Sequence, residues 1–180
     1  ATDQGVMLVN SAGFCTEEVS NHAILMLLAC AKKLPLLNNM VKAGGWGVET
    51  RGAVLPMVPI DGQTLGLVAF GNIARATARK AKVFGLDVIA YDPYLTTERA
   101  ADLAVEKVEL DDLFARADFI TLHTPLTDAT RGIIDAEAFA KMKQGVFIVN
   151  CARGGLVVEA DLRDALQSGK VAGAAVDVFT

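Results

Sequence analysis

The sequence is poor in several residue types, and each scarcity excludes a class of protein. Its 180 residues include only three cysteines, Cys15, Cys30 and Cys151, too few and too widely spaced for a disulfide framework or a cysteine-rich metal site. The 17 basic residues are scattered and the net charge is −4, which gives no electrostatic reason to expect a nucleic-acid partner. We therefore expect no metal, no nucleic acid and a reducing, cytoplasmic setting.

Long hydrophobic runs are also missing. The most apolar window, 23–31, is closed by Lys32 and Lys33 and falls well short of the roughly 20 residues that a membrane span needs. We expect no membrane association. The window predicts either a core helix or a helix that is apolar on more than one face because a second subunit covers it.

The composition, 52% hydrophobic and 21% charged, is that of a globular chain, and its length suits one domain. From residue 64 onward, strand and helix patterns alternate. Strands are predicted at 64–70, 87–91, 118–122, 145–150 and 172–178, and helices at 72–84, 109–116, 135–142 and 158–168, with a weaker one at 96–102. The strands are continuous apolar runs, as expected where both faces of a parallel sheet are covered. The prediction is a doubly wound α/β sheet.

The first third of the chain is harder to interpret. Residues 5–10 predict a short strand, and Thr16 predicts a hydroxyl cap that opens a helix to about Leu34. Pro35 should break that helix or start a second one that ends before residues 44–45. Residues 46–63 are rich in glycine and proline and predict an irregular connecting arm.

The segment 64–74 is the most informative part of the chain. An apolar run meets a turn in which Ala69, Gly71 and Ala74 take the places of the glycines in G-x-G-x-x-G, and a second apolar run ends on Asp92. This is the pattern of a βαβ dinucleotide site, where backbone N–H groups and a helix N-terminus approach a pyrophosphate and the acid accepts hydrogen bonds from a ribose. Gly71 keeps the position where a Cβ would obstruct the pyrophosphate. Ala69 is the doubtful substitution, because the first glycine often serves the tight turn.

Doubly wound sheets bind ligands beyond the carboxyl ends of their strands, so the residues after each predicted strand are candidates. Arg153 lies between an apolar strand and two glycines, and is either a structural arginine or a planar fork for a carboxylate or oxo group of a substrate. Asp177 is either a cap or an acceptor for a carboxamide. For Cys151 we favour packing over a nucleophilic role. The full set of candidates comprises 71–74, 92–93, 123–125, 151–155 and 177.

The two histidines, His22 and His123, are the only candidates for a histidine proton shuttle. His22 has apolar neighbours at one-turn spacing and is expected to be a satisfied core histidine. His123 ends a predicted strand on the ligand-binding edge but immediately precedes Thr124 and Pro125. We do not favour it as a catalytic group.

The segments 66–74, 91–94, 122–134, 149–157 and 174–179 resemble the NAD-binding domain of D-isomer-specific 2-hydroxyacid dehydrogenases, in order and with matching spacing over nearly the whole chain. The stretch 14–22 is most similar to the branch that contains C-terminal binding proteins and relatives of phosphoglycerate dehydrogenase. The resemblance implies a Rossmann fold, NAD as the cofactor, a homodimer formed through the helix near 19–34 and the arm around Trp46, and a small 2-oxo or 2-hydroxy acid as substrate, such as 3-phosphoglycerate, glyoxylate or hydroxypyruvate.

The resemblance also implies a role for each candidate residue. Arg153 matches the catalytic arginine that binds the substrate's carboxylate and carbonyl. Asp92 would bind the adenosine ribose and favour NAD over NADP. The remaining cofactor-binding positions are Gly71, Asn72 and Ile73 at the pyrophosphate, Thr124 and Pro125 in the cleft, Cys151 and Ala152 near the nicotinamide ribose, and Asp177 at the nicotinamide carboxamide.

The departures matter as well. The family's catalytic glutamate and histidine would lie beyond Thr180, and most of its substrate domain would precede residue 1, with 1–12 as a remnant. We therefore expect residues 1–180 to be a cofactor domain excised from a two-domain enzyme, which binds NADH but does not catalyse alone. The alternative is a regulatory protein, similar to a corepressor, that senses NAD(H) through the same fold.

Overall fold

The fold is a single parallel sheet covered by helices on both faces. The computed structural model describes residues 2–9, 11, 13–55 and 57–180. Its sheet has six strands in the order β3-β2-β1-β4-β5-β6. The strands are β1 (Thr64–Val68), β2 (Asp87–Tyr91), β3 (Glu106–Lys107), β4 (Phe119–Leu122), β5 (Val146–Asn150) and β6 (Val171–Val176). The predicted doubly wound architecture is confirmed, and the two-residue strand β3 is one that the sequence analysis missed.

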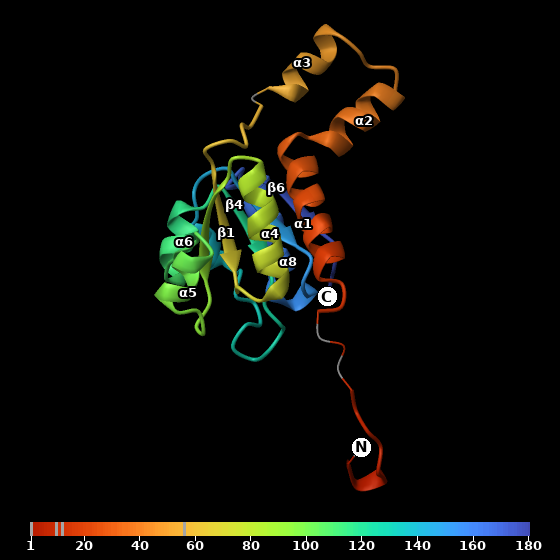
Figure 1. Ribbon diagram of the computed structural model, residues 1–180. Helices are drawn as coiled ribbons and strands as arrows, with labels where there is room; N and C mark the ends of the chain where they lie inside the picture. Colours follow the sequence, from red (N-terminus) through yellow and green to blue (C-terminus); the bar gives the residue numbers. More distant parts are fainter. Residues whose placement is uncertain (1, 10, 12, 56) are drawn as a thin grey trace.

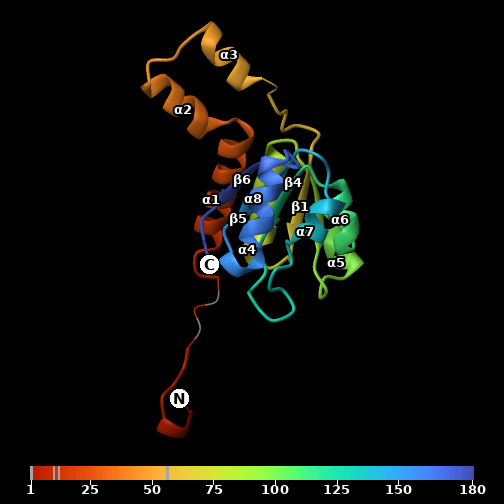
Figure 2. The same cartoon turned by 180° about the vertical axis from the view of Figure 1, so that it is seen from behind.

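Helices of different parts of the chain cover opposite faces of this sheet (Figures 1 and 2). Helices α1 and α4 pack against one face, while α6, α7 and α8 pack against the other. The bounds are η1 (Thr2–Gln4), α1 (Thr16–Ala31), α2 (Leu34–Lys42), α3 (Val48–Val54), α4 (Asn72–Val83), α5 (Thr97–Asp102), α6 (Leu110–Arg116), α7 (Ala136–Lys141), η2 (Gly154–Leu156) and α8 (Glu159–Gln167).

The strand order creates one position where a ligand can enter. From β1 the chain builds outward through β2 to β3, then returns to β4 on the other side of β1 and continues to β6. The crossovers leave β1 and β4 in opposite directions, so a crevice opens at their carboxyl ends. Leu65 of β1 faces Val88 of β2 and Phe119 of β4 across the ladder, which brings the ends of these three strands side by side.

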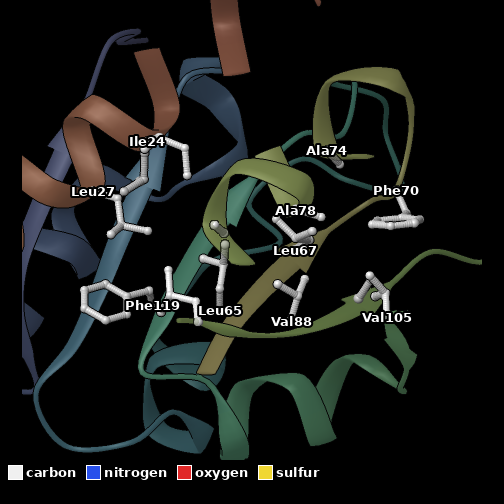
Figure 3. Packing of buried hydrophobic residues seen from close by; sticks show 14 of the residues in the cluster. Ile24, Leu27, Leu65, Leu67, Phe70, Ala74, Ala78, Val88, Val105 and Phe119 are labelled. Carbon is white, nitrogen blue, oxygen red and sulfur yellow. The ribbon is translucent and has the colours of Figure 1, made fainter. Parts of the chain in front are cut away.

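The core on the α1 and α4 side shows why these residues make a sheet covered by helices. Figure 3 shows Ile24 and Leu27 of α1 packed over the strand residues Leu65 and Phe119. The side chain of Leu67 is fully buried beside Ala78 of α4. Truncating a leucine of this kind to alanine typically costs about 2–5 kcal/mol, since the lost burial and the cavity both destabilise the fold.

The amino-terminal expectations are partly wrong. Residues 5–9 are not a strand, residues 2–4 form a single 3₁₀ turn, and position 10 lies outside the described residues. Thr16 does not cap α1; its hydroxyl donates to the carbonyl of Gly13 at 3.0 Å, and Cys15 precedes the helix in a left-handed conformation. Cys15 takes the N-cap position, so Thr16 is already the first helical residue, one position too late to cap the helix, and the Cys15 side chain caps none of the first N–H groups.

The arm also has more structure than its composition predicts. Pro35 lies at the start of α2, so the second of the two predicted alternatives is confirmed, and the supposedly irregular stretch 46–63 contains α3. The side chains of Lys32 and Lys33 hold the base of the arm by donating to the carbonyls of Val58 and Ala53, at 2.9 and 3.0 Å. Such contacts join residues far apart in the sequence and leave no mark in its local composition.

Beyond this base, the arm extends away from the sheet, at the end where β1 begins (Figure 1). Its apolar side chains are exposed, and Trp46 is 81% accessible. Across the described ranges, no single helix is long and apolar enough to cross a membrane; α1 and α2 pass that test only together, with a bend of 62° between them.

Candidate functional site

All the strand-end residues selected from the sequence lie on one edge of the sheet. The turn 69–72 follows β1, Asp92 follows β2, Thr124 follows β4, Arg153 follows β5 and Asp177 follows β6. Because β2, β1, β4, β5 and β6 are neighbours in that order, these groups form a row. The sequence analysis had placed them on a common edge, and the structure places them in a common order across it.

The turn after β1 has the conformation that a nucleotide-binding turn needs. Ala69 has φ +73°, in the left-handed region, and its N–H donates to the carbonyl of Tyr91 at 2.8 Å. An alanine there costs roughly 1–2 kcal/mol relative to a right-handed conformation. The turn is therefore kept even though its first glycine is replaced.

Gly71 is the N-cap of α4 and needs no special backbone angle, with φ −74°. A Cβ built at Gly71 would meet nothing within 4 Å, so the protein itself does not require glycine here. The space next to its backbone lies at the N-terminus of a twelve-residue helix, where free N–H groups and the helix dipole favour an anion. The chemistry of this opening suits an anion such as a pyrophosphate.

Asp92 is fixed by the main chain. Its two carboxylate oxygens accept hydrogen bonds from the N–H groups of Phe70 and Tyr94, both at 2.8 Å. The first bond ties the end of β2 to the β1 turn. Each carboxylate oxygen has a further lone pair, so the group can still accept hydroxyl donors from a ligand.

A cavity of about 310 Å³ opens beside Asp92. It is lined by residues from the ends of β1, β2 and β4, including Ala69, Tyr91, Thr124 and Pro125. Its lining is mostly apolar with one carboxylate at the rim, which suits a flat base attached to a ribose. A larger cavity of about 690 Å³ is lined by α4, the start of α1 and the end of α5; it reaches Phe70 and Asn72 of the β1 turn but does not include Asp92.

At the end of β4, His123 is held in the neutral state. Burial lowers its pKa to about 4, and its Nε2 lies 3.3 Å from the hydroxyl of Thr121. Thr124, which follows, is buried and close to the carbonyl of Pro125 at 3.4 Å. At neutral pH, His123 has no proton to give as an acid beyond its single imidazole N–H.

The loop after β5 is held by a residue that the sequence analysis did not single out. The side chain of Asn150 is fully buried; its amide donates to the carbonyl of Arg153 at 2.9 Å, and its carbonyl accepts from the N–H of Ala152 at 3.0 Å. Asn150 thus closes the loop on itself and fixes where Arg153 begins. A buried asparagine that ends a strand of apolar residues was the available signal.

Arg153 itself is exposed and has guanidinium donors to spare. Its Nη1 donates to the carbonyl of Ala152 at 2.6 Å, and among the residues that the structure describes it forms no ion pair. Gly154 must lack a side chain, since a Cβ there would lie 2.2 Å from the backbone of Phe179. These features favour the carboxylate fork over a structural bridge.

Cys151 is a poor nucleophile. Burial and the charge of Asp177 raise the pKa of its thiol to about 11, and its Sγ lies 3.3 Å from the sulfur of Met26. The thiolate fraction at neutral pH is negligible. The predicted packing role is the one this environment supports.

Asp177 directly follows β6 and lies beside His22, which the sequence analysis expected to be a buried core histidine. His22 is not a core histidine: its side chain is 44% exposed, and its Nε2 lies 3.4 Å from the Oδ1 of Asp177. The expectation failed because apolar neighbours at one-turn spacing report only on the residues of the same helix. The partner of His22, Asp177, comes from the far end of the chain.

Taken together, the fold and the row of strand-end groups define a dinucleotide-binding domain. The family model for the D-isomer-specific 2-hydroxyacid dehydrogenase NAD-binding domain matches residues 24–180. The chain therefore belongs to the D-isomer-specific 2-hydroxyacid dehydrogenase family and contains its NAD-binding domain.

Individual relatives agree with this assignment. The chain is 44% identical over 179 residues to D-3-phosphoglycerate dehydrogenase of Mycobacterium tuberculosis, covering 99% of this chain and 33% of the relative. It is 43% identical over 179 residues to hydroxypyruvate reductase of Thermotoga maritima, covering 99% and 56%. Among solved structures, D-lactate dehydrogenase with NAD⁺ from Lactobacillus jensenii superposes with a TM-score of 0.88 at 26% identity, covering 100% of this chain and 53% of that one. The chain thus spans about a third to just over half the length of these relatives.

Proposed function

We propose that residues 1–180 form the cofactor-binding domain of an NAD-dependent oxidoreductase that interconverts a 2-oxo acid and a D-2-hydroxy acid. The observation that carries the proposal is the row of groups along the carboxyl edge, in which the Asp92 carboxylate is fixed beside an open helix N-terminus by the N–H of Phe70. When bound, NAD supplies or accepts the hydride. The protein's own residues bind and orient the reactants.

The roles along the edge follow from chemistry and position. The N–H groups of Gly71, Asn72 and Ile73 bind the pyrophosphate, and Asp92 binds the adenosine ribose. Thr124 and Pro125 line the adenosine cavity, Cys151 and Ala152 lie at the nicotinamide ribose, and Asp177 accepts from the carboxamide. A carboxylate at the ribose disfavours a 2′-phosphate through charge repulsion, so NAD is preferred over NADP.

Arg153 is proposed as the residue that binds the substrate. Its exposed guanidinium offers parallel N–H donors that match a 2-oxo carboxylate, and its permanent charge polarises the adjoining carbonyl. The reduction also needs a proton for the carbonyl oxygen. The neutral His123, with its pKa lowered to about 4, is a weak source for that proton.

The substrate class follows from the relatives' names, which refer to 3-phosphoglycerate and hydroxypyruvate. The decisive experiment assays the full-length protein that carries residues 1–180. It measures the oxidation of NADH with hydroxypyruvate, 3-phosphohydroxypyruvate, glyoxylate and pyruvate. We expect turnover with at least one of them. Tight NADH binding without turnover of any would instead support the NAD(H)-sensing alternative, and absence of NADH binding would contradict both.

We further propose a homodimer in which the arm α2–α3 lies against a second copy of the chain. The arm exposes several large apolar side chains that a second copy would shield from water: Leu34, Leu36, Val41, Trp46, Val48, Leu55 and Met57. Light scattering at tens of micromolar should give twice the chain mass. Trp46→Glu should yield monomer, whereas Val83→Glu, at an equally exposed apolar residue of α4, should not.

We also propose that the protein works in the cytoplasm, without nucleic acid or membrane as a partner. Its three cysteines are all free thiols, which suits a reducing compartment, and its net charge is −4. Cell fractionation followed by immunodetection tests the compartment. Recovery in the membrane or secreted fraction would contradict it.

A further inference from the structure

His22 has no role among those assigned above, although its partner Asp177 is assigned to the nicotinamide carboxamide. His22 lies in α1 and Asp177 directly after β6, and the two side chains meet with His22 Nε2 3.4 Å from Asp177 Oδ1. Both are about half exposed, at 44% and 50%, so neither is locked by packing. They form the wall of a cavity of about 320 Å³ whose other lining residues are Cys15, Glu18 and Val19.

The backbone of Asp177 is fixed while its carboxylate is not. Its N–H donates to the carbonyl of Asn150 at 3.0 Å, which continues the β5–β6 ladder by one bond. Among the described residues, His22 is the side chain that forms an ion pair with this carboxylate, while the Cys151 thiol lies near enough for its pKa to be raised by the carboxylate charge. Compared with Asp92, which two main-chain N–H groups hold, Asp177 depends on one side chain for its orientation.

We propose that His22 is a positioning residue that turns the Asp177 carboxylate towards the nicotinamide carboxamide. This inference rests on the proposed function, since it assumes that Asp177 accepts from that group. The imidazole lies against Oδ1, with Nε2 at 3.4 Å, and leaves Oδ2 to accept the amide N–H of the cofactor. Without His22 the half-exposed carboxylate must be ordered on binding, which costs affinity.

The proposal makes the effect of His22 specific to one end of the ligand. ADP-ribose lacks the nicotinamide ring, and 3-acetylpyridine adenine dinucleotide carries a methyl ketone with no amide N–H. A residue that acts through Asp177 on the carboxamide affects NADH alone. A residue that merely supports α1 affects all three ligands alike.

The experiment titrates the protein with NADH, reduced 3-acetylpyridine adenine dinucleotide and ADP-ribose by calorimetry. Losing the contact between His22 and the Asp177 carboxylate should make His22→Phe bind NADH about tenfold more weakly, with the other two ligands within about twofold of wild type. His22→Gln keeps an N–H donor and should recover most of the affinity. Asn21→Phe, at the exposed neighbouring position, is the matched control and should change nothing.

The remaining variants separate failure of this inference from failure of the proposed function. Asp177→Leu should lose the same affinity for NADH, and adding His22→Phe to it should have no further effect. Unchanged NADH affinity in His22→Phe, or equal weakening of all three ligands, would overturn the role of His22 while leaving the cofactor site in place. If wild-type protein binds neither NADH nor ADP-ribose, the proposed function itself is wrong.

Discussion

The two ends of the carboxyl edge are built differently. At the β2 end, the Asp92 carboxylate is held by two backbone N–H groups at 2.8 Å, and a cavity of about 310 Å³ adjoins it. At the β6 end, Asp177 is held by a histidine side chain at 3.4 Å, and Arg153 is exposed on a loop that Asn150 closes. One end depends on the main chain and the other on side chains.

This difference matters for what each end can do. Main-chain donors are the same whatever the sequence, so a site built on them is preorganised and costs little to order on binding. Side-chain pairs such as His22–Asp177 move and change readily. The β2 end therefore suits the unvarying adenosine part of a cofactor, and the β6 end suits the part where chemistry and substrate choice occur. The predictions below test this division, from the largest expected effect to the smallest.

Substitution of Arg153 should have the largest effect. Arg153→Ala in the intact protein should lower kcat/KM for the 2-oxo acid by about 1,000-fold, because a charge-assisted, two-pronged contact to the carboxylate is lost. Arg153→Lys should recover little, since an ammonium is a point charge rather than a fork. The Kd for NADH should stay within about twofold, as steady-state kinetics and fluorescence titration can measure.

The control for that experiment is Arg163→Ala. Arg163 is an exposed arginine within α8 that pairs with its neighbour Asp164 at 2.9 Å, and it follows no strand. It should leave both constants unchanged. Activity of Arg153→Ala close to that of wild type would remove Arg153 from the proposed substrate site.

Gly71 tests the β1 turn. Gly71→Val should weaken NADH binding by about 100-fold, because the branched side chain occupies the space of the pyrophosphate. The fold should be unaffected, since a Cβ at Gly71 meets no atom within 4 Å and φ is −74°. Gly52→Val, in α3, is matched in both respects and should bind NADH normally. Loss of the thermal transition in Gly71→Val would mean that the glycine serves the fold instead.

The sequence predicted the β2 end better than the β6 end, for a physical reason. Continuous apolar runs locate β1 and β2, and Asp92 follows directly, so local sequence fixes the geometry there. At the β6 end, the partner of Asp177 is His22, whose own neighbours suggested a buried residue. The role of Asn150 depends on the loop closing back onto its side chain.

Two elements escaped prediction for related reasons. The strand β3 consists of Glu106 and Lys107, which have no apolar pattern and are placed by pairing with β2. The helix α3 contains Gly52 and lies in a stretch whose glycines and prolines signal a loop. In both cases contacts outside the segment override its local propensity.

Substitution of Asp92 tests the β2 end of the carboxyl edge through the preference for NADH over NADPH. Asp92→Asn should reduce the preference for NADH over NADPH by about tenfold, because the repulsion between the carboxylate and a 2′-phosphate is removed. Parallel titrations with the two cofactors give the ratio. Asp87→Asn, at the opposite end of the same strand, is exposed and should leave the ratio unchanged. An unaltered ratio in Asp92→Asn would place the selectivity elsewhere.

His123, between the two ends, should have the smallest effect, seen in stability rather than binding. Burial lowers its pKa to about 4, whereas an unfolded histidine has a pKa of about 6.5. Between these values the unfolded chain binds the proton and the folded one does not, so acidification favours unfolding. From about pH 7 to about pH 5.5 this amounts to a loss of about 1 kcal/mol.

His123→Gln should therefore lose less stability than wild type over the same pH range, by about 1 kcal/mol, in urea unfolding at each pH. The carboxylates titrate alike in both proteins, so they cancel in the difference. An equal pH dependence in the two proteins would mean that the folded state takes up the proton on His123 as readily as the unfolded chain does. In that case the middle of the edge is open to water, and His123 returns as a candidate for the proton donor that the reduction requires.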